Sequence, residues 1–348
     1  MMCRHADRGP VWLRTLPGAA LLGGLLASSV AGASGIGHYN GGLLNVRDYF
    51  LPAHGVHGLL YNHIYSTDRL NDETGEQVDV VLVHPGPGPG IPLGLDVNVF
   101  AYVAAPTLIL VKELNRQGFK FGASITPTLA NTDLDAVFSN AVDLSGAVHG
   151  SAFGIGDLFV RPVWLGLSTA RWELNGSYGF YAPIGDYDTQ HISLPVGQPI
   201  KTVAPSNLGR GYWTHQFQGV LGWYPARERT TAALGAITYE MNGSKEGFDL
   251  TPGANLTLNW GVSHLLPVRE EKSLQFELGV AGFDTWQVTD DTGADARPGR
   301  AEVHAAGWQV SFTHLPTHAW VSLHSFYDYS AKLRLQGSAY NLSVGTTL

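Results

Sequence analysis

Long segments in which apolar and polar side chains alternate are the feature that most limits how this chain can fold. In the segment that starts at Arg171, one set of alternate residues is apolar or small and the other is mainly polar. The first set is Trp172, Leu174, Gly176, Tyr178 and Phe180. A period of two indicates a β-strand with two different faces, because successive side chains of a strand point to opposite sides. The pattern recurs from Ala254, from Leu274 and in the final strand that ends at Leu348.

A soluble β-sandwich and a transmembrane β-barrel both show this alternation, and strand length distinguishes between them. Soluble sheets use strands of about 5 or 6 residues, whereas these segments run about 10 to 13 residues, the length of a tilted strand that spans a bilayer. Aromatic residues stand near the segment ends, as expected at a membrane–water boundary. After residue 33, no apolar run approaches the roughly 18 residues of a spanning helix. We therefore predict an all-β fold, a transmembrane antiparallel up-and-down barrel.

The segments predict about twelve strands, with fourteen as the alternative. Long polar connections alternate with tight turns along the chain, which indicates long external loops and short periplasmic turns. The connection 67–93 contains the Pro-Gly run Pro85–Gly90, and 128–153 is predicted as a second long loop. One connection departs from the pattern, since Pro106–Gln117 is apolar and is predicted to form a short helix at the rim. The strands are expected to begin near Gly55, Gly94, Gly118, Gly154, Arg171, Gly211, Thr230, Ala254, Ser273, Val303, Thr317 and Gln336.

The composition agrees with a barrel whose apolar side chains face lipid. The chain is 44% hydrophobic and 14% charged, with 43 Gly among 348 residues. Lipid-facing strands explain this apolar content without long apolar runs, and Gly relieves crowding where strands curve. The net charge of -8 excludes the basic surface typical of nucleic-acid binding.

The first 33 residues are predicted to be a secretory signal peptide. Three arginines precede the apolar run Ala19–Leu26, and the small residues Ala31-Gly32-Ala33 form a cleavage site. Export to the outer membrane of a Gram-negative bacterium follows, with cleavage near Ala33. Cys3 is the only cysteine of the chain and leaves with this segment, which removes disulfides and thiolate metal sites. The chain then divides into a signal peptide (1–33), an N-terminal periplasmic or lumen-inserted segment (34–54) and the barrel (55–348).

Several stretches at intervals along the chain carry a family resemblance. They are Gly154–Pro162, Tyr178–Tyr187, Asn207–Thr214, Phe248–Gly253, Gly279–Phe283 and Gln287–Asp290, with His54-Gly-Val at the entry to the first strand. In these the chain resembles the bacterial outer-membrane proteins of the "meta-pathway of phenol degradation", or SphA-like, family. The resemblance implies a barrel of roughly a dozen strands that passes small, often apolar or aromatic compounds, without a catalytic motif. The terminal Leu348 departs from the aromatic residue with which such barrels usually end.

Polar residues on the predicted inward faces are the candidates for solute selection. They form either a mixed-charge constriction or a salt-bridge network that stiffens a narrow lumen, and both interpretations stay open. The aromatic candidates for the lumen lining are Phe100, Tyr102, Phe283 and Trp320. The polar candidates are Asp96, Lys120, Asp157, Arg161, Arg171, Glu173, Glu277, His324 and Asp328.

The segment Gly37–Ala53 is too long to be a simple tail before the first strand. It combines apolar residues with charge, including Arg47, Asp48, Tyr49 and Phe50. One hypothesis is that this segment folds into the lumen as a plug. The alternative is that it lies on the periplasmic rim.

Neither a metal centre nor catalytic chemistry is predicted. His54-x-x-His57 has ligand-like spacing, but residues three apart in a strand face opposite sides, and the His314-x-x-x-His318 pair flanks Pro316. No Gly-x-Ser-x-Gly motif occurs, and we expect no cofactor.

The sequence as a whole predicts a passive outer-membrane channel for small, apolar or aromatic molecules. Its expected partners are outer-membrane lipid, the solute and the barrel-assembly machinery. A structural or ligand-capturing barrel without transport and a barrel lipid hydrolase are the alternatives.

Overall fold

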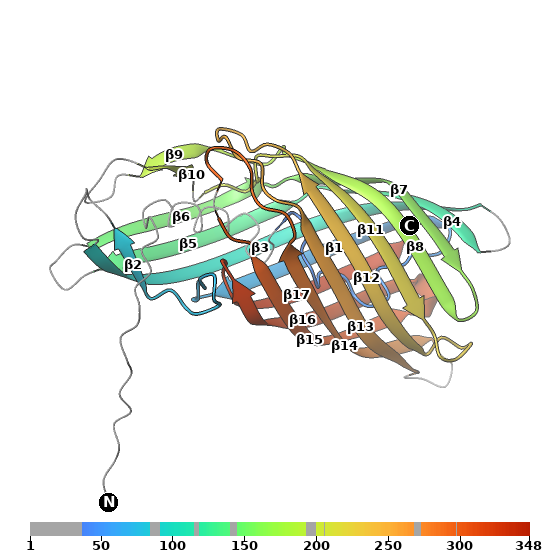
Figure 1. Ribbon diagram of the computed structural model, residues 1–348. Helices are drawn as coiled ribbons and strands as arrows, with labels where there is room; N and C mark the ends of the chain where they lie inside the picture. Colours follow the sequence, from blue (N-terminus) through green and yellow to red (C-terminus); the bar gives the residue numbers. More distant parts are fainter. Residues whose placement is uncertain are drawn as a thin grey trace, which may run out of the picture.

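Twelve antiparallel strands close into a ring in the computed structural model, which describes residues 37–83, 91–114, 118–139, 145–192, 200–204, 206–267, 273–296 and 298–348 (Figure 1). Strand β3 pairs back with β1, so the ring has no edge strand. Every backbone N–H and C=O of such a ring can pair within the sheet, as hydrocarbon requires. The predicted barrel and its strand number are confirmed. In ring order the strands are β1 (Gly55–Thr67), β17 (Ser338–Thr347), β16 (Ala319–Lys332), β15 (Glu302–His314), β14 (Leu274–Gln287), β13 (Asn255–Pro267), β12 (Thr231–Asn242), β11 (Thr214–Trp223), β8 (Trp172–Ala182), β7 (Leu158–Ser168), β4 (Phe119–Thr126) and β3 (Ile91–Glu113).

The two ends of the barrel differ in their connections. The turn end carries the short connections, among them the 3-10 turn η1 (Leu315–Thr317), together with the C-terminus. There the N–H of Leu348 donates to the carbonyl of Val56 at 2.8 Å. The loop end carries the long connections, one of which contains the hairpin of β9 (Thr189–Ile192) and β10 (Ile200–Val203). Among the described residues, no helix has the length and apolar character needed to cross a membrane.

The faces of the strands are inverted relative to a soluble protein. On β8, Trp172 and Leu174 are each 47% exposed on the outside of the barrel, whereas Glu173 and Asn175 are only 6% and 7% exposed. The same division holds on β13 and β17, where inward Asn and Ser side chains are buried. Apolar side chains therefore face outward and polar ones face the lumen, which suits a barrel in hydrocarbon.

The wall continues beyond the ring at the loop end. The upper part of β3 pairs with β5 (Leu129–Ser139), which pairs with β6 (Ser145–Ile155). These strands run on from β4 and β7 after interruptions at residues 127–128 and 156–157, and β2 (Val80–Val83) pairs with β3 on its other side. Figure 1 shows this extension projecting past the other strands. In the described sheet, β6 and β2 each pair with one strand only.

Two predicted connections are strands instead. Pro106–Glu113 belongs to β3, and most of 128–153 forms β5 and β6. The apolar run in β3 misled the prediction because both faces of this strand are apolar: Leu108 and Leu110 face outward, while Ile109 and Val111 are buried inside. The signal peptide (1–33) and the Pro-Gly run at 85–90 lie outside the described residues.

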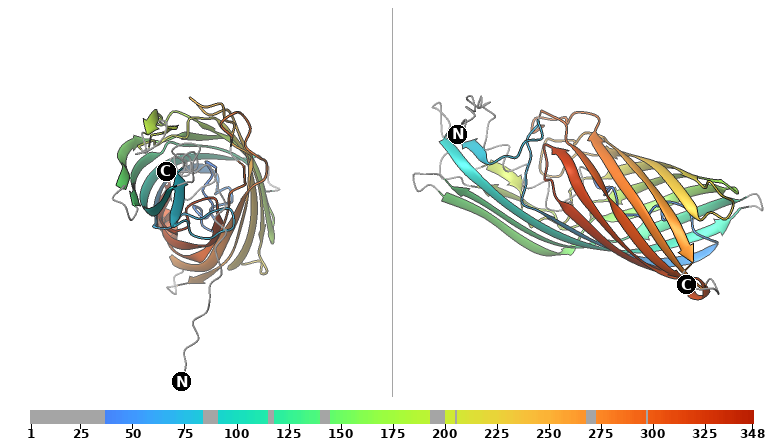
Figure 2. Two further views of the ribbon diagram at one scale, coloured as in Figure 1. Left: turned by 60° about the vertical axis from the view of Figure 1, so that its left-hand side comes forward. Right: turned by 90° about the horizontal axis from the view of Figure 1, so that it is seen from below.

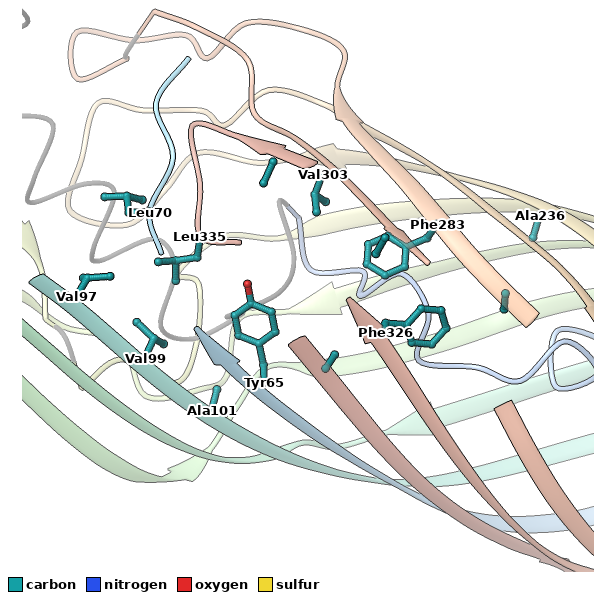
Figure 3. Close-up of a cluster of buried hydrophobic side chains, with 14 of the residues drawn as sticks. Tyr65, Leu70, Val97, Val99, Ala101, Ala236, Phe283, Val303, Phe326 and Leu335 are labelled. Atoms are coloured by element: carbon teal, nitrogen blue, oxygen red, sulfur yellow. The ribbon is translucent and has the colours of Figure 1, made fainter. Parts of the chain in front are cut away.

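Part of the lumen near the loop end is filled by apolar side chains (Figure 3). Val97, Val99 and Tyr65 point inward from β3 and β1, as Figure 3 shows. Leu70, from the connection after β1, joins them and pairs with Leu335 from the connection after β16. External connections are thus packed onto the wall in this region.

Candidate functional site

The segment Gly37–Ala53, called the lumen segment below, lies inside the barrel (Figure 2). Its backbone forms turns and bends without a helix or strand, so its N–H groups need partners from the wall. Inward side chains of β12, β13 and β15 accept from three of these groups. The pairs are Tyr39 N–H with Glu240 Oε1 (2.7 Å), Gly42 N–H with Asn259 Oδ1 (3.1 Å) and Val46 N–H with Gln309 Oε1 (3.0 Å).

Arg47 fastens the lumen segment at the turn end of the barrel. Its Nε donates to Oε1 of Glu277 at 2.9 Å. Its Nη2 donates to the carbonyls of Arg229 and Thr230, each at 3.0 Å. The Glu277 residue is only 7% exposed, so this ion pair is shielded from water more than a surface pair would be.

Glycines on the inward faces of the wall make room for apolar side chains of the lumen segment. A Cβ on Gly222 would overlap the ring of Phe50. A Cβ on Gly122 or Gly166 would crowd Leu51 in the same way. The wall is therefore complementary in shape to the segment, and larger residues at these positions would displace it.

Asp157 ties the lumen segment to the loop end. It lies where the wall is interrupted between β6 and β7. Its carboxylate accepts from the backbone N–H of Gly185 at 3.1 Å and of Arg210 at 2.8 Å. Nε2 of His38 lies 2.9 Å from the same carboxylate, and the His38 ring stacks on Tyr181. Burial lowers the pKa of His38 to about 4, so this imidazole is neutral at pH 7.

A cavity of about 200 Å³ separates the lumen segment from the inward face of β3. That face is apolar where it lines the cavity, with Ala101, Val103, Ala105 and Ile109. His38, Asn40 and other residues of the lumen segment form the opposite side. The lumen thus holds an apolar wall beside a segment that carries polar groups.

A β-bulge in β7 turns two long side chains into this cavity. The register with β8 shifts between Val160 and Val163. Arg161 and Trp164, three residues apart, consequently both face inward, at 7% and 2% exposure. The guanidinium carbon lies 4.5 Å from the centroid of the Trp164 ring and 5.3 Å from that of Phe159. Bulges re-aim side chains and are frequent beside functional sites.

Comparison with known protein families assigns the chain to one of them. Residues 67–344 match the family described as "Putative MetA-pathway of phenol degradation". The chain belongs to this family. The resemblance found in the sequence is confirmed.

The chain is also similar in fold to solved structures of outer-membrane barrels. An outer membrane channel from Pseudomonas putida F1 is 15% identical, with a TM-score of 0.60 over 88% of this chain and 100% of that chain. The translocator domain of the autotransporter NalP from Neisseria meningitidis is 10% identical, with a TM-score of 0.50 over 87% and 92% of the two chains. At these identities the likeness concerns the fold. No curated protein sequence matches the chain.

Three stretches that carry the family resemblance meet at Asp157. Gly154–Pro162 contains Asp157 itself, Tyr178–Tyr187 contains Gly185, and Asn207–Thr214 contains Arg210. A Cβ on Gly185 would lie 2.8 Å from backbone atoms of Gly156 and Gly209, so the chain segments approach too closely for a larger residue. The family stretches therefore build the junction between wall and lumen segment.

Most of the predicted lumen residues face the inside of the barrel, but they do not form a single ring of charged groups. Glu173, near the turn end, accepts from the Tyr224 hydroxyl at 2.9 Å. Asp328, toward the loop end, accepts from the Tyr65 hydroxyl at 3.2 Å. Asp157 and Arg161 line the cavity together. The inward residues are Lys120, Asp157, Arg161, Glu173, Glu277, Phe283, His324 and Asp328.

Two of the inward residues hold the lumen segment from the wall side. Nζ of Lys120 donates to the carbonyl of Pro52 at 3.1 Å. The ring of Phe283 fills the space beside Gly41 and Gly42, and its centroid lies 5.8 Å from that of Phe326.

Other predicted lumen residues lie elsewhere. Asp96 and Phe100 are exposed on the outer face of β3, and Tyr102 on the same face donates to Asn62 at 2.8 Å. The prediction was wrong because odd-numbered, largely apolar residues of β3 face inward, so polarity did not mark the lumen side. Arg171 is exposed in the turn before β8. Trp320 lies on the same inward face of β16 as the buried Ser322 and His324, but it packs against Gly345 near the turn end and does not line the cavity.

Several contacts of the site were missed from the sequence. Asn259 and Gln309 stand on the inward faces of alternating strands, which was the available signal, but their partners in the lumen segment were not identified. Glu240 was missed in the same way. Trp164 was missed because the bulge shifts the alternation of β7, and Pro162 within the strand was the only local sign of it.

Residues of metal-ligand type gather at one exposed place among the described residues. Ligand atoms of Asp133, Asp135 and His149, on β5 and β6, lie within 4.8 Å of one another. The histidine pairs considered in the sequence have other partners: Nε2 of His57 bonds to the carbonyl of Ala53 at 2.8 Å. Nδ1 of His314 bonds to Thr317 at 2.8 Å.

Replacement of Asp48 by Asn is expected to tighten the lumen segment at neutral pH. Burial, with a contribution from the charge of Glu277, raises the pKa of Asp48 to about 7. The Asp48 carboxyl therefore stays protonated up to about pH 7 when the lumen segment is inserted, but only up to about pH 4 when the segment is released. The inserted state consequently loses stability relative to the released state as the pH rises from about 4 to 7. His38 acts oppositely, since its lowered pKa weakens insertion as the pH falls from about 6.5 to 4.

The difference between wild type and Asp48→Asn isolates the carboxyl from the other titrating groups. We expect the variant to open less often than wild type at pH 7 in planar bilayers, with the two converging toward pH 4. Asp290→Asn in an exposed loop is the control and should match wild type at every pH. Parallel curves for wild type and Asp48→Asn would contradict the role given to this carboxyl.

Proposed function

We propose that this protein is an outer-membrane channel for the passive uptake of small, apolar or aromatic molecules. Membership of the phenol-degradation family and the fold of an outer-membrane barrel support the channel class. The observation that carries the finer proposal is the cavity against the apolar inward face of β3. An apolar solute gains free energy where it contacts apolar side chains such as those that β3 presents to the cavity.

The proposed cellular setting follows from the same features. The protein is exported through its signal peptide, and the assembly machinery inserts it into the outer membrane of a Gram-negative bacterium. The turn end then faces the periplasm and the loop end faces outward. Strand β17 pairs with β1 from Ser338 to Thr347, which favours closure and insertion of the ring.

In the proposed mechanism, solutes move by diffusion without coupled energy. Apolar solutes partition into the cavity from the loop side and pass when the lumen segment shifts. Hydrogen bonds and the ion pair of Arg47 hold that segment in place, so its displacement would limit the rate of passage.

Uptake by cells with an intact lipopolysaccharide leaflet tests this proposal. Ala105 lines the cavity, whereas its neighbour Ala104 lies on the opposite, lipid-facing side of β3. We expect Ala105→Trp to reduce uptake of labelled benzyl alcohol to the level of cells without the barrel, and Ala104→Trp to leave it unchanged. Barrel amounts are matched by heat-modifiable mobility on gels.

Equal uptake with and without the barrel would overturn the channel proposal for these solutes. If the purified barrel nevertheless bound benzyl alcohol, the ligand-capturing alternative without transport would be supported. Turnover of labelled phospholipid by the purified barrel would instead support the hydrolase.

A further inference from the structure

Arg161 is a buried cation without a counter-ion. The residue is 7% exposed, and its Nε has no hydrogen-bond partner in the described structure. No carboxylate of the described residues lies within 4.0 Å of the guanidinium, which contacts the rings of Trp164 and Phe159 instead. Cation–π contacts offset only part of the cost of removing a charge from water. A buried charge of this kind is normally paired, so the site lacks a negative partner.

Other unpaired polar atoms line the same cavity. Nε1 of Trp164 is a buried donor without a partner. Oδ1 of Asn40, on the lumen segment, and Oε1 of Gln216, on β11, are buried acceptors without partners. Buried polar atoms are satisfied in the great majority of cases, so the two donors, Nε of Arg161 and Nε1 of Trp164, indicate a missing acceptor, while the two orphan acceptors require a donor such as water.

The carboxylates that line the cavity are engaged elsewhere. Asp157 accepts from two backbone N–H groups and contacts His38. Asp48 accepts from Asn45 at 2.8 Å. Neither carboxylate therefore serves as the counter-ion of Arg161.

We propose that the cavity binds a small carboxylate with an apolar body, such as an aromatic acid, with the carboxylate at Arg161. The apolar body would rest on Ala101, Val103 and Ala105 of β3, opposite the lumen segment. Drug-sized ligands use about 300–1,000 Å³, so the cavity of about 200 Å³ limits the occupant to a single small ring or a short branched chain. This inference rests on the proposed function and specifies its solute as a weak acid in anionic form.

Calorimetry on the purified full-length mature barrel, with benzoate and benzyl alcohol as probes, tests the assignment. The two probes share a ring and differ in charge. Benzoate is expected to bind more tightly than benzyl alcohol to the wild-type barrel. The Arg161→Met variant is expected to bind benzoate about 30-fold more weakly than wild type, because it loses the charge-assisted hydrogen bonds of the guanidinium. Arg161→Lys should retain part of the benzoate affinity. Arg171→Met, in the exposed turn, is the matched control and should behave as wild type.

The outcomes separate this inference from the channel proposal. Equal affinity of wild type for the two probes, or benzoate affinity unchanged in Arg161→Met, overturns the carboxylate assignment. An unchanged melting temperature in Arg161→Met excludes misfolding, and unchanged benzyl alcohol binding shows that the cavity persists. The uptake of benzyl alcohol and its loss in Ala105→Trp test the channel independently, because that probe carries no charge.

Discussion

Deletion of residues 37–53 is expected to raise the single-channel conductance several-fold. The lumen segment fills the turn half of the barrel, where Phe50 and Leu51 occupy spaces beside Gly222, Gly122 and Gly166. Removing it exposes these inward glycines and short polar side chains, and a twelve-stranded ring is wider than the eight-stranded rings that side chains alone can fill, so a wider water path opens. The conductance is measured for wild type and the deletion variant in planar lipid bilayers.

The ring is expected to assemble without the lumen segment. Every strand of the ring pairs with two neighbours, and none of these ladders includes residues 37–53. Buried polar side chains that lose partners, such as Glu240 and Asn259, gain water in an open lumen. Heat-modifiable mobility on gels checks that the deleted barrel folds.

A linker variant distinguishes blocking from a mere change of chain length. Replacing residues 37–53 with Gly and Ser keeps the length and removes the side-chain contacts of Arg47, Phe50 and Leu51. We expect its conductance to approach that of the deletion. Traces equal to wild type in both variants would refute the plug and would place the ion path elsewhere in the barrel.

The barrel itself could be predicted from the sequence because lipid imposes a simple rule on each strand. Apolar residues face hydrocarbon and polar ones face the lumen. The alternation of Trp172, Glu173 and Leu174 therefore shows directly which side of the barrel wall each side chain faces. The turn and loop ends were also predictable from the lengths of the connections. These properties depend on local sequence and on the solvent, not on distant contacts.

The rule fails where the lumen is itself apolar or where a strand is irregular. On β3, Ile109 faces inward and Leu108 outward, so their polarity did not identify the lumen side. In β7 the bulge places Arg161 and Trp164 on one face, against a period of two. These exceptions form the cavity, which is why the candidate site was less predictable than the wall around it.

The contacts of the lumen segment were beyond prediction for a different reason. Val46 and Gln309 are far apart in the sequence, and their hydrogen bond depends on how a segment without regular structure settles inside a closed ring. Neither periodicity nor propensity determines such a path. The sequence supported the hypothesis of a plug through length and composition alone.

Replacement of Arg47 by Met is expected to release the lumen segment about 30-fold more often than in wild type. The variant leaves the carboxylate of Glu277 without its cation and the carbonyls of Arg229 and Thr230 without their donor. Breaking a buried pair from one side costs about 3–5 kcal/mol, and the partial exposure of the Arg47 side chain (21%) reduces this to about 2 kcal/mol. Each 1.4 kcal/mol is about tenfold in the open-to-closed ratio.

A second substitution shows whether the unpaired charge is the cause. Arg47→Met combined with Glu277→Leu removes the stranded carboxylate, and apolar replacement of a buried pair is often neutral, so we expect the double variant to recover most of the closed state. Arg300→Met is the matched control, because the Arg300–Asp290 pair joins half- to largely exposed side chains and contributes little. Open probability in planar bilayers is compared for the four proteins. If Arg47→Met stays as closed as Arg300→Met, the ion pair does not hold the segment, and its retention depends on the glycine-lined spaces of the wall.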